Sequence, residues 1–157
     1  MNTKTLSLLF LRKGDQILLA MKKRGFGKGR WNGVGGKVED GESIESAMIR
    51  ESEEEIGVTP TTYEEVGDIS FDEFFKGEPT IMHVHIFMAS RWQGEPIESD
   101  EMTPQWFNVN DVPYDAMWPD DTYWLPQVLD GKKVSAHFQL DETDAILSHD
   151  VQEVEGF

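Results

Sequence analysis

Residues 35–58 read GGKVEDGESIESAMIRESEEEIGV, a glycine-rich loop that leads into a predicted helix. Ser43 is a favourable N-cap residue and Gly57 a usual terminating residue, so we expect the helix to follow Ser43 and to run to about Ile56. The segment contains seven Glu. Like charges three and four residues apart repel each other along a helix, so this density of carboxylates indicates that some of them bind a cation.

One face of this helix changes from apolar to acidic along its length. At 3.6 residues per turn, the stripe that contains Ile44 and Met48 continues through Glu51, Glu54 and Glu55. Carboxylates therefore occupy positions where a core-facing stripe would carry on. Mg²⁺ and Mn²⁺ prefer hard oxygen ligands, so the three side chains predict a divalent-metal site that water and a substrate phosphate would complete.

A solvated acidic face is the usual alternative explanation for a run of charges. This alternative suits Glu45 and Glu53, which point to other sides of the predicted helix. It suits the three converging Glu less well, because a solvated face more often alternates Glu with Lys or Arg. We therefore expect Glu45 and Glu53 to be solvated and the other three to bind metal.

Length and composition limit the class of protein. The chain has 157 residues, of which 38% are hydrophobic and none is Cys. This predicts one domain over residues 1–157 with its own core, and it excludes disulfides and thiol catalysis. The first apolar run is too short for a signal peptide, and no stretch has the length of a membrane span. We expect a monomeric, cytoplasmic protein with no membrane partner.

Charge is distributed unevenly along the chain. The net charge of −16 opposes binding to a nucleic-acid polymer, which requires clustered Lys and Arg. Ten of the 14 basic residues nevertheless lie in the first 50 positions, and five of them fall between Lys22 and Arg30. A small basic region beside an acidic cluster suits a metal-bound phosphate compound, so we expect a small-molecule partner.

A loop at residues 25–36 contains six glycines together with Phe26, Trp31 and Asn32. Glycine lets backbone N–H groups approach an anion closely, whereas the aromatic residues argue against a flexible linker. We therefore expect this loop to bind an anion.

The rest of the chain predicts strands around this loop and helix. Two β-rich runs at 5–11 and 16–21 flank Lys13-Gly14-Asp15 and predict a hairpin. Residues 117–124 open a last helix, with Pro119 in its first turn. The tail at 141–157 shows no clear pattern. A connection at 77–80 is expected to join two strands at 66–75 and 81–90. Further strands are expected at 105–109 and 133–140.

His83 and His85 fall on one face of the predicted strand 81–90. Two His at this spacing are typical of part of a zinc site. No third ligand stands near them in the sequence at a suitable spacing, so we expect both to be structural.

The spacing from Gly36 resembles the Nudix box, G-x5-E-x7-R-E-U-x-E-E-x-G-U, in which U is a bulky aliphatic residue. Ser52 departs from the pattern at an aliphatic position, which removes a core contact but no metal ligand. The glycine and charged positions all match, and they are Gly36, Glu42, Arg50, Glu51, Glu54, Glu55 and Gly57.

The resemblance implies a Nudix fold of the α/β (α+β) class, a mixed β-sheet between helices, which hydrolyses a nucleoside diphosphate linked to another moiety. In the family the last carboxylates of the box bind the metals, which here means Glu51, Glu54 and Glu55 with the Gly36 carbonyl. Glu51 or Glu54 would accept the proton of the attacking water. Glu42 and Arg50 would pair and brace the loop against the helix.

Segments outside the box look like the MutT-homologue subfamily of oxidised purine nucleoside triphosphatases. They are residues 21–27, 29–33, 98–102 and 117–121. This likeness implies Mg²⁺-dependent hydrolysis of 8-oxo-dGTP and 2-hydroxy-dATP to the monophosphate and pyrophosphate. It adds Glu101 as a further metal-side carboxylate, and two residues between Phe71 and Gly77 look inserted. The implied substrate-binding residues are Ser7, Lys22, Phe26, Asn32, Gly35, Gly36, Lys37, Phe71, Met82, Met102, Trp118, Asp120 and Asp121.

The chemistry of the predicted base pocket follows from its residue types. A purine offers a flat face to Trp118 and Phe26 and a polar edge to carboxylates and amides. Two adjacent carboxylates near an apolar surface resist ionising together, so we expect the pKa of Asp120 or Asp121 to be raised and that group to donate a hydrogen bond. The alternative is that the pair only caps the last helix.

Three other functions fit parts of the sequence. Other Nudix enzymes cleave dinucleoside polyphosphates, ADP-ribose or coenzyme A, and they often carry a marker Tyr or Pro after the box that residues 73–76 lack. Nudix modules that only bind ligands usually lose the box carboxylates, which are present here. A plain acidic metal buffer would need neither the aromatic residues nor the basic loop.

Overall fold

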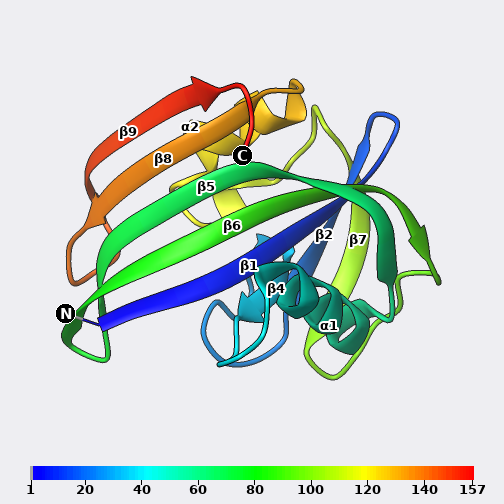
Figure 1. The fold of residues 1–157 in the computed structure, drawn as a ribbon, viewed down its shortest axis with the longest axis horizontal. Helices are drawn as coiled ribbons and strands as arrows, with labels where there is room; N and C mark the ends of the chain where they lie inside the picture. The colour runs from blue at the N-terminus through cyan, green and yellow to red at the C-terminus, as the bar shows by residue number, and fades with distance from the viewer. Residues whose placement is uncertain (1) are drawn as a thin grey trace.

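The computed structural model describes residues 2–157, which form one mixed sheet and two α-helices (Figure 1). In chain order the elements are β1 (Asn2–Lys13), β2 (Gln16–Lys22), β3 (Trp31–Asn32), β4 (Val34–Lys37), α1 (Ile44–Ile56), β5 (Thr59–Phe75), β6 (Glu78–Gln93), β7 (Met102–Asn108), the 3-10 helix η1 (Tyr114–Ala116), α2 (Asp121–Leu129), β8 (Lys133–Leu140) and β9 (Ile146–Val154).

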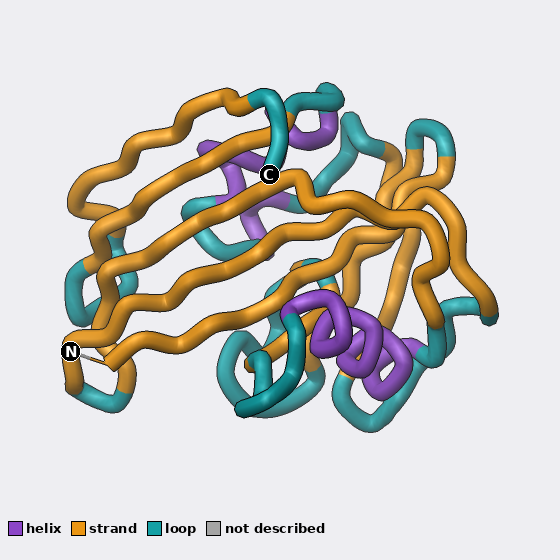
Figure 2. Tube along the Cα trace, viewed as in Figure 1, coloured by secondary structure: helices purple, strands orange, loops and turns teal. Residues whose placement is uncertain are grey.

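The sheet has nine strands, with β3-β2-β1-β6-β5-β8-β9 as its continuous path. Strand β4 also pairs with β1, and β7 pairs with β2. The pairs β1–β6 and β5–β8 are parallel, whereas β5–β6 and β8–β9 are antiparallel. Figure 2 shows these strands as a curved layer with α1 in front and α2 behind. The expected mixed sheet between helices is confirmed.

Alternating residues of β1 face the two helices. Leu9 and Leu11 pack in the core cluster that contains Met48 of α1, whereas Phe10 packs in the cluster that contains Trp124 of α2. This is the period-two alternation of a strand that is covered on both sides. One long strand therefore connects both halves of the core.

The predicted hairpin and box helix are confirmed. Lys13 pairs with Gln16 across a two-residue turn, in which Gly14 has a φ of 59°. The Ser43 hydroxyl accepts a hydrogen bond from the Ser46 N–H at 3.1 Å. Gly57 ends α1 in the left-handed conformation, with a φ of 71°. These features depend on neighbouring residues, which is why the sequence reveals them.

Several predicted boundaries were too short. The hairpin β5–β6 continues to a pair between Phe75 and Glu78, so its turn is Lys76-Gly77 and not residues 77–80. The loop at 25–36 contains the short strands β3 and β4, and the tail forms β9. Edge strand β9 keeps mostly polar side chains, so its main-chain pairing with β8 left no strong hydrophobic pattern.

Ser52, the departure from the aliphatic pattern, is fully buried and its hydroxyl donates to the Val58 carbonyl at 2.8 Å. Ser52→Ala leaves that carbonyl with poorer hydrogen bonding, so we expect a loss of about 1–2 kcal/mol in the free energy of unfolding. Urea denaturation measures this loss. The exposed Ser90→Ala variant should match the wild type, and an equal loss in both variants would contradict the assigned role.

Candidate active site

Helix α1 brings Glu51 and Glu55 against strand β4. Glu55 is only 4% exposed, and its carboxylate accepts a hydrogen bond from the Gly35 N–H at 3.3 Å. A Cβ atom at Gly36 would lie 2.8 Å from Oε1 of Glu51. Position 36 therefore has to be glycine for the helix carboxylates to approach the strand this closely.

The third carboxylate of the predicted metal face points elsewhere. Glu54 is 59% exposed and pairs with Arg50 at 3.3 Å. Among the residues that the structure describes, the carboxylates of Glu51, Glu54 and Glu55 do not gather into one three-ligand cluster. Two of the three predicted ligands thus lie at β4, and the third lies at the exposed edge of the helix.

The position of Glu55 makes its ionised form unfavourable without a cation. Burial raises the pKa of Glu55 to about 8, and the charge of Glu51 adds to this rise, while the Gly35 N–H and Lys22 act in the opposite direction. Two crowded carboxylates with hard oxygen donors fit a divalent cation, which would offset their repulsion. The residues present at β4 therefore fit the implied metal.

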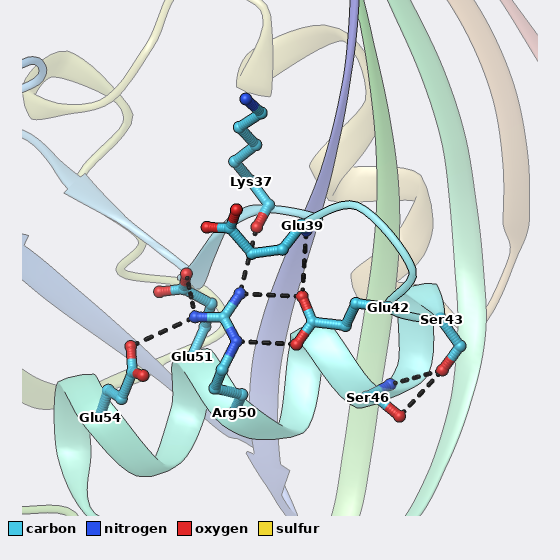
Figure 3. Close-up of polar contacts among 8 residues, drawn as sticks. All are labelled: Lys37, Glu39, Glu42, Ser43, Ser46, Arg50, Glu51 and Glu54. Atoms are coloured by element: carbon cyan, nitrogen blue, oxygen red, sulfur yellow. Dashed lines mark hydrogen bonds and ion pairs between the residues drawn. The ribbon is translucent and has the colours of Figure 1, made fainter.

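Arg50 connects the loop before α1 to the carboxylates on it (Figure 3). Its guanidinium donates to both carboxylate oxygens of Glu42, at 2.8 and 3.0 Å, and to Glu51 at 3.0 Å. A further hydrogen bond reaches the Lys37 carbonyl at 3.2 Å. The hydrogen bonds from Arg50 lower the pKa of Glu42. The expected Glu42–Arg50 pair is therefore present and also holds Glu51.

We expect disruption of this pair to weaken metal binding and catalysis by about 10–100-fold, as is typical for residues that orient ligands. Glu42→Gln removes one charge from the pair and leaves Glu51 in place. The Mg²⁺ concentration for half-maximal activity measures the effect. Glu45→Gln is the control, because Glu45 lies on α1 and accepts a hydrogen bond only from the Tyr63 hydroxyl among the described residues. Equal Mg²⁺ requirements in the two variants would contradict the role of the Glu42–Arg50 pair.

The carboxylates of Glu51 and Glu55 form what we call the carboxylate face. A cavity of about 260 Å³ adjoins this carboxylate face at Gly35 and Gly36. Most of the residues predicted to bind substrate line it. Lys37 and Glu101 lie outside the lining that the described residues form, and both are exposed. The predicted residues that line it are Ser7, Lys22, Phe26, Asn32, Gly35, Gly36, Phe71, Met82, Met102, Trp118, Asp120 and Asp121.

Ser7 borders the cavity, but its hydroxyl points to the other side of β1. Leu6 and Leu8 line the cavity, so strand alternation places the Ser7 side chain on the same face as Leu9, which packs in the core cluster of α1. Its hydroxyl is buried with no hydrogen-bond partner among the described residues. In this orientation the hydroxyl does not point toward a substrate in the cavity, so the implied role of Ser7 in substrate binding would rest on its backbone.

Aromatic side chains form the mouth of the cavity. Phe26 stacks on Trp118 with ring centroids 5.0 Å apart and an angle of 28° between the rings. The Arg30 guanidinium lies 4.4 Å from the centroid of Trp118. Phe26 is 63% exposed, so one face of Trp118 is covered by a ring that is itself largely open to solvent.

Asp120 and Asp121 lie at the wall of the cavity where α2 begins. Asp120 occupies the N-cap position, but its side chain makes no capping hydrogen bond within the described residues. It accepts the Trp124 indole N–H at 2.9 Å instead. Asp121 is 3% exposed, and its Oδ2 has no partner in the described part of the chain. The capping explanation therefore does not account for the pair.

The pKa values of both Asp side chains are raised. Burial, followed by the charge of Asp120, raises the pKa of Asp121 well above its usual range. Burial also raises the pKa of Asp120, against the hydrogen bond from Trp124. The predicted rise in pKa thus falls on both groups and most strongly on Asp121, which favours a neutral acid that can donate a hydrogen bond.

Two acidic residues of the cavity are not among those that the sequence predicted. Glu73 and Asp144 line the wall near Asp120. Burial and the charges of Asp144 and Asp120 raise the pKa of Glu73 to about 7, against Lys4. Strand alternation from Phe71 places Glu73 on the cavity face and was a usable signal. Asp144 comes from the tail, where no pattern pointed to the cavity.

His83 and His85 have a candidate third ligand that the spacing in the sequence did not reveal. Asp68 on β5 lies 2.5 Å from His83, measured from Oδ1 to Nε2. The antiparallel pairing of β5 with β6 brings it there, although Asp68 is 15 residues away from His83 in the sequence.

The box helix and the cavity beside it belong to a known family of proteins. A NUDIX domain model matches residues 1–128, which include the box helix and the cavity residues on β1, β2 and β6, so the chain belongs to the Nudix family. None of the described helices is long and apolar enough to cross a membrane.

Two vertebrate proteins and one bacterial structure are similar to this chain over nearly its whole length. The chain is 48% identical over 151 residues to an oxidized purine nucleoside triphosphate hydrolase of Mus musculus, covering 96% of both chains. It is 47% identical over 153 residues to a protein of that name from Danio rerio, covering 98% of this chain and 97% of the relative. A crystal structure of a MutT protein from Bacillus halodurans shares the fold with a TM-score of 0.83 and 28% identity, over 95% of this chain and 97% of that one.

Proposed function

We propose that this protein hydrolyses oxidised purine nucleoside triphosphates, namely 8-oxo-dGTP and 2-hydroxy-dATP, to the monophosphate and pyrophosphate, and so removes them from the nucleotide pool. The observation that carries the proposal is the continuity of two sites. Buried carboxylates meet the cavity at Gly35 and Gly36, and Asp120 and Asp121 lie in the cavity wall. Nearly full-length similarity to the two vertebrate hydrolases supports it.

The carboxylate face would act on the triphosphate. Mg²⁺ held by Glu51 and Glu55 with the Gly36 carbonyl, and by Glu54 once it turns away from Arg50, would neutralise the phosphates and lower the pKa of a bound water. Lys22 lines the cavity and its charge acts on Glu55, so it is placed to attract a phosphate. Arg50 fixes Glu51 through a hydrogen bond of 3.0 Å. Glu51 and Glu54 are the candidates to accept the proton of the attacking water.

The cavity would bind the base. Trp118 offers an aromatic face once Phe26 has moved aside, and Asn32 offers an amide. A neutral Asp121 donates a hydrogen bond to a base oxygen or ring nitrogen, while Asp120, when ionised, accepts from an N–H group. The oxygen added to either purine changes the donors and acceptors on its edge, so a pair with both protonation states accepts more than one oxidised base.

The protein would work as a monomer on small molecules in the cytoplasm, with no nucleic-acid polymer as partner. Its net charge of −16 supports the last point, because polymer binding depends on clustered basic residues.

Pyrophosphate release across a nucleotide panel tests the proposal. The panel contains 8-oxo-dGTP, 2-hydroxy-dATP, dGTP and dATP, with ADP-ribose, a dinucleoside polyphosphate and coenzyme A as substrates of other Nudix enzymes. We expect Mg²⁺-dependent release that is at least about 10-fold faster for the two oxidised nucleotides, a discrimination of one hydrogen bond or more. Preference for another compound, or binding without hydrolysis, would contradict the proposal.

A further inference from the structure

Strands β5 and β6 bring three metal-binding side chains together on the face of the sheet opposite the cavity. His83 and His85 alternate with Met82 and Val84, which line the cavity. The antiparallel register places Asp68 opposite His85. One ligand atom from each of Asp68, His83 and His85 lies within 4.8 Å of the others. The His rings themselves are close, with centroids 4.4 Å apart.

The cluster lies on a part of this face that α1 leaves open. Further along β6, Phe87 and Ala89 share the side of the two His and pack in the core cluster of α1. Figure 1 shows α1 over one end of the strands, with the fronts of β5, β6 and β8 uncovered elsewhere. The His83 and Asp68 side chains are each 36% exposed, and His85 is 13% exposed. An ion can therefore reach the cluster from solvent.

The donor set is typical of one class of ion. Two imidazole nitrogens and one carboxylate oxygen suit Zn²⁺ and similar transition metals, whereas Mg²⁺ prefers oxygen ligands alone. Tetrahedral ligands of Zn²⁺ at its usual bond lengths lie about 3.4 Å apart. The ligand atoms of the cluster lie within 4.8 Å of one another, and water would fill the fourth position.

A fourth side chain holds one of the ligands in position. Glu65 accepts a hydrogen bond from Nδ1 of His85 at 2.9 Å. This contact leaves Nε2 of His85 as the nitrogen with a free lone pair. Carboxylates hydrogen-bonded to the second nitrogen of a ligating His are a regular feature of zinc sites, because they fix the tautomer and the ring orientation.

The buried hydroxyl of Ser7 is a separate observation at the same place. Ser7 lies beside His85 in the parallel register of β1 and β6. Its side chain points to the same face as His85, since Leu6 and Leu8 point into the cavity. It is 2% exposed, and its Oγ has no partner among the described residues. A water molecule bound to an ion at the cluster would give the Ser7 hydroxyl a hydrogen-bond partner.

We propose that Asp68, His83 and His85 form a binding site for a Zn²⁺-like transition-metal ion, oriented by Glu65 and separate from the carboxylates of α1. The ion joins β5 to β6 on the face opposite the nucleotide cavity. This site does not depend on the proposed nucleotide hydrolysis, because it shares no residue with the carboxylate face.

Zinc titration by calorimetry in saturating Mg²⁺ tests the site, because Mg²⁺ occupies oxygen-only sites. We expect one Zn²⁺ per wild-type chain, and at least about 10-fold weaker affinity in both His83→Asn and Asp68→Asn, since even outer partners of zinc ligands contribute 10–100-fold. His137→Asn is the matched control, because His137 lies on the same open face and pairs with Asp72 at 3.0 Å. Equal zinc affinity in the wild type and both ligand variants would overturn the proposal.

X-ray absorption at the zinc edge gives a second, independent test. The wild type should show two imidazole ligands for each Zn²⁺, and Glu65→Gln should keep both but bind zinc more weakly. A spectrum with oxygen ligands alone would overturn the assignment. Circular dichroism confirms folding of each variant, and the half-exposed positions of Asp68 and His83 make both substitutions compatible with the fold.

Discussion

Glu55→Gln is expected to lower kcat for 8-oxo-dGTP by about 10³-fold at saturating Mg²⁺. The substitution keeps the size of a side chain that is only 4% exposed but removes a charged metal ligand. A metal ion contributes several kcal/mol of charge stabilisation in the transition state, and about 4 kcal/mol corresponds to 10³-fold in rate. Steady-state pyrophosphate release measures the effect.

Glu53→Gln is the matched control for this variant. Glu53 is exposed on the same helix, where it accepts a hydrogen bond from the Thr59 hydroxyl at 2.7 Å. It should keep nearly the full rate. Full turnover by Glu55→Gln under saturating Mg²⁺ would remove Glu55 from the metal site.

Glu55→Gln should also raise the stability of the folded protein when no metal is present. The pKa of Glu55 in the folded protein is about 8, above its usual value of 4.5. A raised pKa means that folding favours the protonated form, so its contribution to stability is complete below about pH 4.5 and is lost as pH rises through 8. With a chelator present, the Tm of the wild type should therefore fall more than that of Glu55→Gln between pH 5 and 8. Glu73, Asp120 and Asp121 titrate in both proteins, so their contributions to the change in Tm cancel in the comparison. Parallel curves of Tm against pH for the two proteins would contradict the burial of a charge at Glu55.

Asp120→Asn and Asp121→Asn are expected to change substrate discrimination. The pKa of both Asp is raised, and that of Asp121 lies well above its usual range. Asn at either position keeps a donor but cannot ionise. Each hydrogen bond at a buried site is worth about 1–3 kcal/mol. We expect the ratio of kcat/KM for 8-oxo-dGTP over dGTP to change by about 10–100-fold in at least one variant.

Asp130→Asn provides the control for this pair. Asp130 is the exposed C-cap residue of α2, the helix that Asp120 and Asp121 begin, so it shares their helix without touching the cavity lining. Its discrimination ratio should equal that of the wild type. If the ratio is unchanged in both Asp120→Asn and Asp121→Asn, the pair does not read the base.

The sequence predicted the box helix, its caps and the Glu42–Arg50 pair because their determinants are local. Ser43, Gly57 and the Glu42–Arg50 pair all lie within one loop and one helix, where helical spacing determines which side chains meet. The sequence did not predict that Glu54 turns to Arg50 and that Glu55 is the most buried of the three. Those positions depend on how α1 packs against β4, which residue spacing alone does not give.

Contacts between distant strands account for the other differences. Asp68 and His83 meet through the register of a long hairpin, and Asp144 reaches the cavity from a tail whose strand has mostly polar side chains. Long-range pairing of this kind leaves only a weak periodic signal in the sequence. The stacking of Phe26 on Trp118 was missed as well, because residue type predicted an aromatic wall but not which faces of it are free.

Phosphorus NMR of the products formed from 8-oxo-dGTP in Mg²⁺ tests the central claim most directly. The claim is that the carboxylates of α1 and the adjoining cavity act together on one triphosphate. It predicts equal amounts of the nucleoside monophosphate and pyrophosphate, formed by the wild type only when Mg²⁺ is present. Formation of the diphosphate with orthophosphate, or an unchanged spectrum after incubation, would contradict it.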